Sequence, residues 1–310
     1  MADILAYGEA LAEFNQTRPG NAEWRLGYGG DTSNFCIAAA RQGASAGYIG
    51  AVGDDRFGQG LRELWQAEGV DQTHVRTDTQ APTGVYFVAH DASGHRFDYL
   101  RAGSAASRYR AEQLPRQAIA SARALHLSGI SLAISNDACD AGLDAMAQAR
   151  AAGVMVSFDT NLRLRLWPLA RACAVIREAL RRCDVCLPSW DDITAVLDCE
   201  ERDAIVDTLL SWGSRVVALK MGARGCYVAT TDRRTLVPPH AVDAVDATGA
   251  GDCFGGAFVA RLVAGDDALA AARYANVAAA LSTTGYGAIA SIPRAEDVHG
   301  ALTDALAWHA

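Results

Sequence analysis

The strongest constraint on the fold is a regular alternation of strand and helix patterns between Ala124 and Lys220. Apolar runs predict strands at 124–128, 154–158, 184–187 and 215–220, and between them helical patterns predict helices at about 134–151, 169–181 and 190–211. Strands separated by helices in this way run parallel, and each helix crosses over one face of the sheet. The chain is therefore expected to be an α/β protein whose ligands bind beyond the carboxyl ends of its strands.

The segments on either side extend this sheet and add a smaller one. On the amino side, strands are predicted at Ile4–Gly8 and Ala46–Val52, and helices at Thr32–Arg41 and Arg56–Ala67; a polar segment through Trp24 separates the first strand from the first helix. On the carboxyl side, strands are predicted at Gly225–Thr230 and Thr235–Val237, and a helix at Asp267–Thr283. Two alternating runs, Gly84–His90 and Arg96–Arg101, flank the turn at 91–94 and predict a hairpin. Because a hairpin does not belong inside a parallel series, it is expected in a small lid sheet.

Composition limits the classes of function. The chain has 310 residues, half of them apolar, and a net charge of −8 with no basic run, which argues against a nucleic-acid partner. The first residues lack the pattern of a secretory signal, and no apolar run reaches the ~18 residues of a membrane span. Eight scattered cysteines indicate reduced thiols and a cytoplasmic protein. Cys183 and Cys186 have the spacing of a metal or redox pair, but no second pair follows, so we expect buried thiols.

The run Asp246–Phe258 carries the clearest chemical signal. Its first half, through Gly249, Ala250 and Gly251, is made of small residues, and its second half opens an apolar helix. Free N–H groups and the helix dipole at such a point favour a phosphate. A carboxylate at the same point, Asp252, would repel a resting phosphate, so we expect it to accept the proton of an attacking hydroxyl instead. The alternative is an ordinary turn with Asp252 as a helix cap.

The whole run resembles the carboxyl-terminal signature of the PfkB/ribokinase family of sugar and nucleoside kinases. The segment Gly29-Gly30-Asp31-Thr-Ser-Asn34 likewise resembles the sugar-binding element of that family, although alone it could be a helix start capped by Asp31 or Thr32. The resemblance implies a single domain over 1–310 with a three-layer α/β/α ribokinase-like fold. Its central sheet would be mainly parallel, and the lid would comprise about 10–30 and 82–104. It also implies ATP and Mg²⁺ as cofactors, a monovalent cation in some members, and a homo-oligomer formed through the lid.

A narrower resemblance is to 2-keto-3-deoxygluconate kinases. It rests on the Gly-Gly-Asp-Thr form and on the segments around Tyr86, Tyr99, 127–134 and 158–168. The substrate of these kinases carries a carboxylate, and arginine suits planar, bidentate recognition of that group. The acceptor-binding residues implied are Gly29, Gly30, Asp31, Asn34, Tyr86, Tyr99, Arg101, Ile130, Arg163 and Asp252. Salt bridges for the arginines and lid packing for the tyrosines are the alternatives, and Arg165 competes with Arg163.

Nucleotide contacts are implied by the same resemblance. Lys220-Met-Gly-Ala-Arg-Gly225 resembles the family turn near the phosphates and the ribose. The residues implied are Asn161, Arg163, Ser189, Lys220, Gly222, Gly225, Gly249, Gly251, Asn276 and Ser282. Many members hold hydrated Mg²⁺ through an Asn-x-x-Glu segment. Here Ser189 and Asp192 replace those two residues, so either Asp192 or its neighbour Asp191 would hold a water of magnesium.

The activity implied is transfer of the γ-phosphoryl group of ATP to the terminal (C6) hydroxyl of 2-keto-3-deoxygluconate, with Asp252 as the base and the N–H groups of residues 249–251 stabilising charge. A kinase for fructose, another sugar acid or a nucleoside is one alternative. A nucleotide-binding regulator without catalysis is another, although the intact loop argues against it. A dinucleotide-dependent oxidoreductase fits less well, because its glycine-rich turn would follow the first strand.

Overall fold

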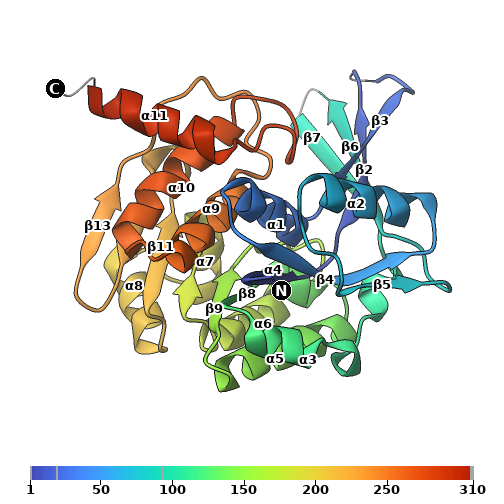
Figure 1. The fold of residues 1–310 in the computed structure, drawn as a ribbon, viewed down its shortest axis with the longest axis horizontal. Helices are drawn as coiled ribbons and strands as arrows, with labels where there is room; N and C mark the ends of the chain where they lie inside the picture. Colours follow the sequence, from blue (N-terminus) through green and yellow to red (C-terminus); the bar gives the residue numbers. More distant parts are fainter. Residues whose placement is uncertain (1, 19, 92–93, 308–310) are drawn as a thin grey trace.

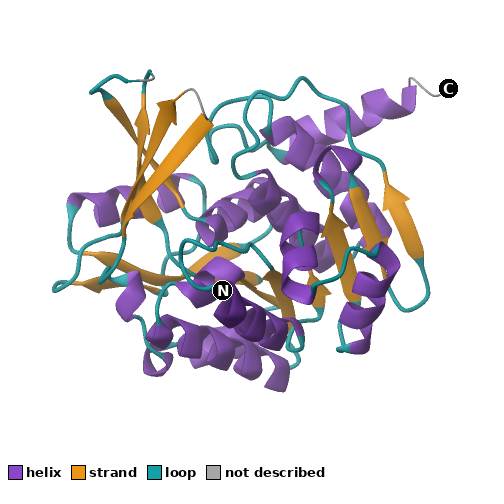
Figure 2. Cartoon of the chain, turned by 180° about the vertical axis from the view of Figure 1, so that it is seen from behind, coloured by secondary structure: helices purple, strands orange, loops and turns teal. Residues whose placement is uncertain are grey.

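A computed structural model describes residues 2–18, 20–91 and 94–307, and it shows a central sheet between two helical layers, with a small sheet to one side (Figures 1 and 2). The central sheet has nine strands in the order β13-β12-β11-β10-β9-β8-β1-β4-β5. β12 runs antiparallel to both of its neighbours, and the other pairs are parallel. The strands are β1 (Ile4–Tyr7), β4 (Ala46–Gly53), β5 (Val75–Asp78), β8 (Ala124–Ser128), β9 (Met155–Asp159), β10 (Val185–Cys186), β11 (Val216–Lys220), β12 (Cys226–Ala229) and β13 (Arg234–Val237).

Each face of this sheet has its own hydrophobic core. On β1, Leu5 and Tyr7 belong to one core and Ile4 and Ala6 to the other, as expected for a strand covered on both faces. The first core is completed by α3 (Arg116–Ser121), α4 (Gly129–Ala133), α5 (Asn136–Ala151), α6 (Leu169–Leu180), α7 (Trp190–Leu197) and α8 (Arg202–Ser211). The second is completed by α1 (Asp31–Arg41), α2 (Arg56–Ala67), α9 (Ala250–Ala264), α10 (Ala268–Ser282) and α11 (Ala295–Ala307). Single 3₁₀ turns lie at Ala106–Arg108, Ala111–Gln113 and Gly222–Arg224.

The small sheet is the lid, which projects beyond α2 in Figure 1. It contains β2 (Leu11–Gln16), β3 (Trp24–Gly29), β6 (Val85–Asp91) and β7 (Gly94–Leu100) in the order β3-β2-β6-β7. The predicted hairpin is β6–β7, and the parallel pair β2–β6 joins it to β2 and β3. The polar segment through Trp24 therefore has regular structure, because it contains the antiparallel strands β2 and β3. The predicted three-layer α/β fold with a lid is confirmed.

One predicted helix is divided in the structure, and another begins slightly later than predicted. The helix predicted over 190–211 is wrong as a single element, because Asp198 adopts a left-handed conformation that ends α7, and Glu201 then caps α8 by accepting from two backbone N–H groups at 3.1 Å. The helix predicted from about 134 begins instead after Ser135, whose hydroxyl caps α5. The elements β5, α3 and α11 were not predicted.

Two smaller predictions can be compared with the structure. Cys183 and Cys186 are both fully buried, as expected, and their sulfur atoms lie 3.1 Å apart. Across residues 2–18, 20–91 and 94–307, none of the helices combines the length and the apolar character needed to cross a bilayer.

The helices α1 and α9 contact each other at backbone distance. A Cβ atom added to Gly256 of α9 would lie 2.5 Å from the carbonyl oxygen of Phe35 and 2.9 Å from the backbone nitrogen of Ala39, both on α1. Only glycine permits so close an approach of two helix backbones. The relative position of these two helices therefore depends on Gly256.

We expect Gly256→Ala to destabilise the protein by about 1–3 kcal/mol, because the new methyl group would press on the backbone of α1. Gly300→Ala is the matched control, since Gly300 also lies in a helix but has no atom within 4 Å of an added Cβ. That variant should gain about 0.5–1 kcal/mol from helix propensity. Urea unfolding of both variants measures the difference, and equal effects would contradict the close packing of α1 and α9.

Candidate active site

The predicted site residues gather beyond the carboxyl ends of the parallel strands. β1 lies between β8 and β4, so the chain winds in opposite directions on its two sides. At such a switch point the loops after neighbouring strands diverge and leave room for a ligand. Asp159 ends β9 and Lys220 ends β11, while α1 and α9 begin at the same edge.

The amino-terminal ends of α1 and α9 lack side-chain caps. α2, α4, α5, α7, α8 and α10 each begin with a side chain that accepts from a backbone N–H group. α1 and α9 begin instead at Gly30 and Gly249, with positive φ values of 117° and 77° and no side-chain cap. The proposed cap by Asp31 or Thr32 is thus wrong, because Asp31 is already the first residue of the helix. Uncapped helix ends leave N–H groups and a positive dipole end for a ligand.

Asp252, in the first turn of α9, is joined to α1 by a hydrogen bond. The side-chain amide of Asn34 donates to its Oδ2 atom at 2.8 Å. In the same way the amide of Asn161, after β9, donates to Oδ2 of Asp31 at 2.8 Å. Asp31 Oδ1 and Asn34 Oδ1 are buried without a hydrogen-bond partner among the described residues. Oxygen atoms of this kind suit the hydroxyl groups of a ligand, because a hydroxyl can donate to each of them.

The surroundings of Asp252 oppose its ionisation. Loss of hydration is the main cause and repulsion by Asp31 the second, and together with a smaller effect of Asp159 they raise the pKa of Asp252 to about 8. The hydrogen bond from Asn34 and the charge of Lys220 act in the opposite direction. The side chain keeps partial contact with solvent. A carboxyl group with its pKa near neutrality is suited to accept a proton and release it again.

Lys220 is the positively charged residue near Asp252. Its ammonium group forms a largely buried ion pair with Asp159, and the ammonium nitrogen is 3.5 Å from the position of a Cβ at Gly251. The cation is therefore next to the uncapped start of α9. A positive side chain beside free backbone N–H groups is a suitable arrangement for phosphate oxygens.

The lid contributes a cluster of aromatic and charged groups. The ring of Tyr86 on β6 stacks with that of Tyr99 on β7 at 5.8 Å, and its hydroxyl fills the space of a side chain at Gly29. The same hydroxyl donates to Glu13. Asp252 is near enough to influence the ionisation of Tyr86. The lid tyrosines and the start of α9 therefore belong to one site.

Arg101, directly after β7, is paired with an acid that sequence reasoning missed. Its guanidinium forms an ion pair with Glu9, which follows β1 after Gly8 and has a fully buried side chain. Burial raises the pKa of Glu9, while Arg101 and a hydrogen bond from Ser104 lower it. A salt bridge was one of the alternatives considered for Arg101. Glu9 and Glu13 carry no local sequence signal, because a single acid near a strand end is common.

Some predicted residues do not join this cluster. Arg163 is exposed, and its guanidinium donates to the neighbouring carbonyl of Leu162 at 2.9 Å, whereas its competitor Arg165 reaches the carbonyl of Phe97 on the lid. Ile130 is partly buried in α4.

On α10, two predicted residues bond to the backbone. Asn276 donates to the carbonyls of Val237 and Pro238, at 3.2 and 3.0 Å, and Ser282 donates to Ala279 at 2.8 Å. These bonds stabilise the local backbone. The predicted nucleotide contacts of Asn276 and Ser282 stay predictions.

The predicted magnesium residues lie near β9. Oδ2 of Asp192 accepts from the backbone N–H of Leu162 at 3.1 Å, whereas Asp191 is exposed. The Ser189 side chain caps α7, and the Ser189 backbone forms an isolated parallel β-bridge with Lys220. Within the described part of the chain, no group of three or more His, Cys, Asp or Glu side chains could hold a metal ion directly. These residues would fit an ion held mainly through water and phosphate oxygens, for which Asp192 or Asp191 could hold a water.

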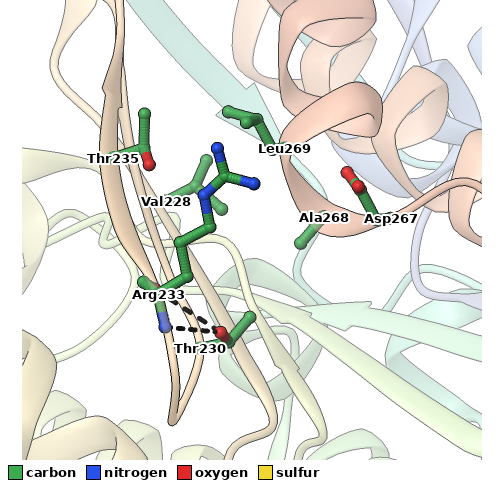
Figure 3. Close-up of a pocket in the computed structure, with 7 residues that line it drawn as sticks. All are labelled: Val228, Thr230, Arg233, Thr235, Asp267, Ala268 and Leu269. Atoms are coloured by element: carbon green, nitrogen blue, oxygen red, sulfur yellow. Dashed lines mark hydrogen bonds between the residues drawn. The ribbon is translucent and has the colours of Figure 1, made fainter.

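A separate hollow of about 130 Å³ lies between the β12–β13 turn and the start of α10 (Figure 3). Thr230, which follows β12, is one of its lining residues, and the last residue of β12 pairs with the beginning of β11. The hollow is therefore at the opposite edge of the sheet from Asp252. None of the predicted site residues lines it.

The chain is similar to known proteins over nearly its whole length. A 2-dehydro-3-deoxygluconokinase of Thermoproteus tenax is 36% identical over 290 residues, covering 91% of this chain and 88% of that protein. Fructokinase-1 of Zea mays is 33% identical over 319 residues, covering 95% of this chain and 96% of that protein. A candidate ribokinase II of Escherichia coli, solved with ATP and Mg²⁺, superposes with a TM-score of 0.91 at 26% identity and covers 98% of this chain and 100% of that one.

The family model described as pfkB family carbohydrate kinase matches residues 1–295. This match spans both sheets and all the residues gathered around Asp252. With identities above 30% to two kinases that align over nine-tenths of its length, the chain belongs to the pfkB family of carbohydrate kinases.

Proposed function

We propose that the protein transfers the γ-phosphoryl group of ATP to the C6 hydroxyl of 2-keto-3-deoxygluconate, which is also called 2-dehydro-3-deoxygluconate. The observation that carries the proposal is the position of Asp252 in the first turn of α9, where Asn34 of α1 donates to it at 2.8 Å. Lys220 and, in the lid, Tyr86 are both within electrostatic range of this carboxylate. A carboxylate close to both a cation and a group of hydroxyl-binding side chains can act on the acceptor of a phosphoryl group. The kinase of Thermoproteus tenax is the relative that supports this acceptor.

The proposed mechanism uses Asp252 as the base. The acceptor oxygen forms a bond to the γ-phosphorus, the bond from that phosphorus to the bridging oxygen of ADP breaks, and the hydroxyl proton passes to Asp252. The N–H groups of Gly249 and Gly251, at the start of α9, stabilise the charge on the phosphoryl oxygens. The N–H of Ala250, which was predicted to act with them, already donates to the carbonyl of Ala247 at 3.2 Å. Lys220 adds a positive charge at the same place. Mg²⁺, when bound with the nucleotide, neutralises charge on its β- and γ-phosphates.

On the acceptor side, Gly29, Gly30, Asp31, Asn34 and Ile130 are proposed to line the sugar. Tyr86 and Tyr99 would cover it, and Arg101 or a rearranged Arg163 would bind the carboxylate. The nucleotide would contact Asn161, Arg163, Ser189, Lys220, Gly222, Gly225, Asn276 and Ser282, with Asp192 holding a water of Mg²⁺. A monovalent cation near the loop and a homo-oligomer formed through the lid remain predictions.

Phosphorylation of fructose is a second candidate, and two contacts favour it. Glu9 neutralises Arg101, and Glu13 places a second carboxylate beside the hydroxyl of Tyr86. Both carboxylates reduce the attraction of the site for an anionic sugar, whereas a neutral sugar would lose nothing. Fructokinase-1 of Zea mays is only slightly less similar to this chain than the sugar-acid kinase is.

Replacement of Arg101 should separate these two acceptors. Arg101→Lys keeps the charge that balances Glu9 but removes the planar fork, so kcat/KM for the sugar acid should fall about 10- to 100-fold, and kcat/KM for fructose should change much less. A coupled assay of ADP release with both sugars measures this. Arg261→Lys is the control, because Arg261 pairs with Asp266 at the carboxyl-terminal end of α9, the opposite end from Asp252. Greater wild-type activity on fructose than on the sugar acid would exclude the proposed acceptor.

Asp252→Asn should lower kcat by about 10²-fold or more, because the amide cannot accept the hydroxyl proton. Its affinity for ATP should stay close to that of the wild type, and equilibrium binding of ATP checks this. Asp137→Asn, which alters an exposed carboxylate paired with Arg110, is the control and should keep full turnover.

Thermal unfolding shows whether Asp252→Asn still folds. A carboxyl group whose pKa is raised on folding destabilises the folded state progressively as the pH rises from its unfolded pKa towards its folded one. The Asn variant should therefore be at least as stable as the wild type near pH 8. Normal turnover in a well-folded Asp252→Asn variant would remove the base from the mechanism.

The pH profile should reflect the same carboxylate. Because the pKa of Asp252 is raised to about 8, the base is mostly protonated at lower pH. We expect kcat/KM for the acceptor to rise about tenfold per pH unit below this value and to level off above it. Steady-state rates between about pH 5.5 and 9.5, with saturating ATP, measure the profile. A flat profile over this range would show that ionisation of Asp252 does not limit the reaction.

A further inference from the structure

The ion pair between Glu9 and Arg101 joins the lid to the central sheet. Glu9 follows β1, and its side chain is 0% exposed, while Arg101 follows β7 and is 10% exposed. Oε1 of Glu9 also accepts from the hydroxyl of Ser104 at 2.5 Å, and that hydroxyl accepts from the backbone N–H of Ser107 at 3.2 Å. The carboxylate of Glu9 is thus held by two buried partners, the guanidinium of Arg101 and the hydroxyl of Ser104. A carboxylate held in this way retains its charge mainly because Arg101 is beside it.

Arg101 keeps a donor that its partner does not use. Its Nη2 atom forms the ion pair with Glu9, whereas its Nε atom is buried and has no hydrogen-bond partner among the described residues. The guanidinium carbon is 5.9 Å from the centre of the Tyr99 ring, within the lid cluster. A buried guanidinium with unused N–H groups is expensive unless a ligand oxygen accepts from it. Arg101 can therefore contact an acceptor sugar while it remains paired with Glu9.

We infer that Glu9 is a positioning residue that sets the acceptor preference of the enzyme. It holds Arg101 beside the lid tyrosines and cancels its charge, so that Arg101 offers directed hydrogen bonds rather than a net positive field. The inference rests on the proposed function only in assuming that the acceptor binds beside Arg101. The side chain of Glu9 bonds to Arg101 and Ser104, and of these two only Arg101 is proposed to contact the acceptor, so we expect the influence of Glu9 to pass mainly through Arg101.

Loss of the charge of Glu9 should have an effect that depends on the charge of the acceptor. In Glu9→Gln the amide can still accept from Ser104, but the cation of Arg101 is no longer balanced. An anionic acceptor would then gain attraction, and a neutral one would gain none. We expect the ratio of kcat/KM for 2-keto-3-deoxygluconate to kcat/KM for fructose to rise about tenfold. A residue that only supported the fold would lower both values together.

A double-mutant cycle tests whether the effect passes through Arg101. In an Arg101→Met background, Glu9→Gln should leave the ratio unchanged, because a fully buried Glu9 without its cation takes up a proton and then has no charge to lose. Glu68→Gln is the control, since it removes the acid of the Arg41–Glu68 pair far from the acceptor and should not alter the ratio. An unchanged ratio in Glu9→Gln, or an equal change in both backgrounds, would overturn the inference.

Two further measurements keep the test decisive. If Glu9→Gln fails to fold, as judged by thermal unfolding, Glu9→Met takes its place, because it also removes the charge with a side chain of similar length, and the ratio should again rise about tenfold. Glu9→Asp is the conservative control, since it keeps the charge and should preserve the ratio. An unchanged ratio in Glu9→Met, or a shifted ratio in Glu9→Asp, would refute charge balance as the cause. If the wild type phosphorylates fructose alone, the proposed sugar-acid function fails, and gluconate then serves as a competitive inhibitor. Its inhibition constant should still fall about tenfold in Glu9→Gln, and no change would refute the role of Glu9 separately.

Discussion

Repulsion between buried carboxylates is the constraint on which the rest of this site depends. Glu9, Asp31, Asp159 and Asp252 come from four separate segments, and the winding of the sheet brings all of them to one edge. Two of them are balanced by cations, Glu9 by Arg101 and Asp159 by Lys220. Among the described residues, Asp31 and Asp252 receive side-chain hydrogen bonds from the amides of Asn161 and Asn34. The pKa of Asp252 is raised mainly by loss of hydration, and repulsion by Asp31 adds to this effect.

The same charges explain why the two halves of the site differ. On the phosphate side, Lys220 stands beside an uncapped helix, so positive charge and free N–H groups coincide. On the proposed acceptor side, Glu9 balances the charge of Arg101, and we expect recognition to depend on hydrogen-bond direction and on the tyrosine rings. In this proposal, strong anion binding is confined to one half of the site, which would reduce the chance that a sugar acid occupies the place of a phosphate.

Much of the fold could be predicted from sequence because its signals are local. The buried strand at 124–128 and the helix at Arg56–Ala67 have the predicted bounds, since apolar periodicity alone defines them. The division of 190–211 was missed because it depends on one left-handed residue, Asp198, whose conformation no periodicity reveals. For the site, the glycine-rich motifs placed Asp252 and Asn34 correctly at helix starts. The pairing of Arg101 with Glu9 was missed because it joins distant segments through tertiary structure.

The glycine contact between α1 and α9 has a consequence for how such an enzyme can move. The start of α1 carries Asp31 and Asn34, and the start of α9 carries the phosphate loop and Asp252. Since Gly256 brings the two backbones together, neither helix can slide without a clash, and both helix starts behave as one rigid body. We therefore expect any opening and closing to come from the lid, which is connected to the main body before β2, after β3, before β6 and after β7. Substrate entry would then change the position of the lid, while the starts of α1 and α9 keep their places relative to each other.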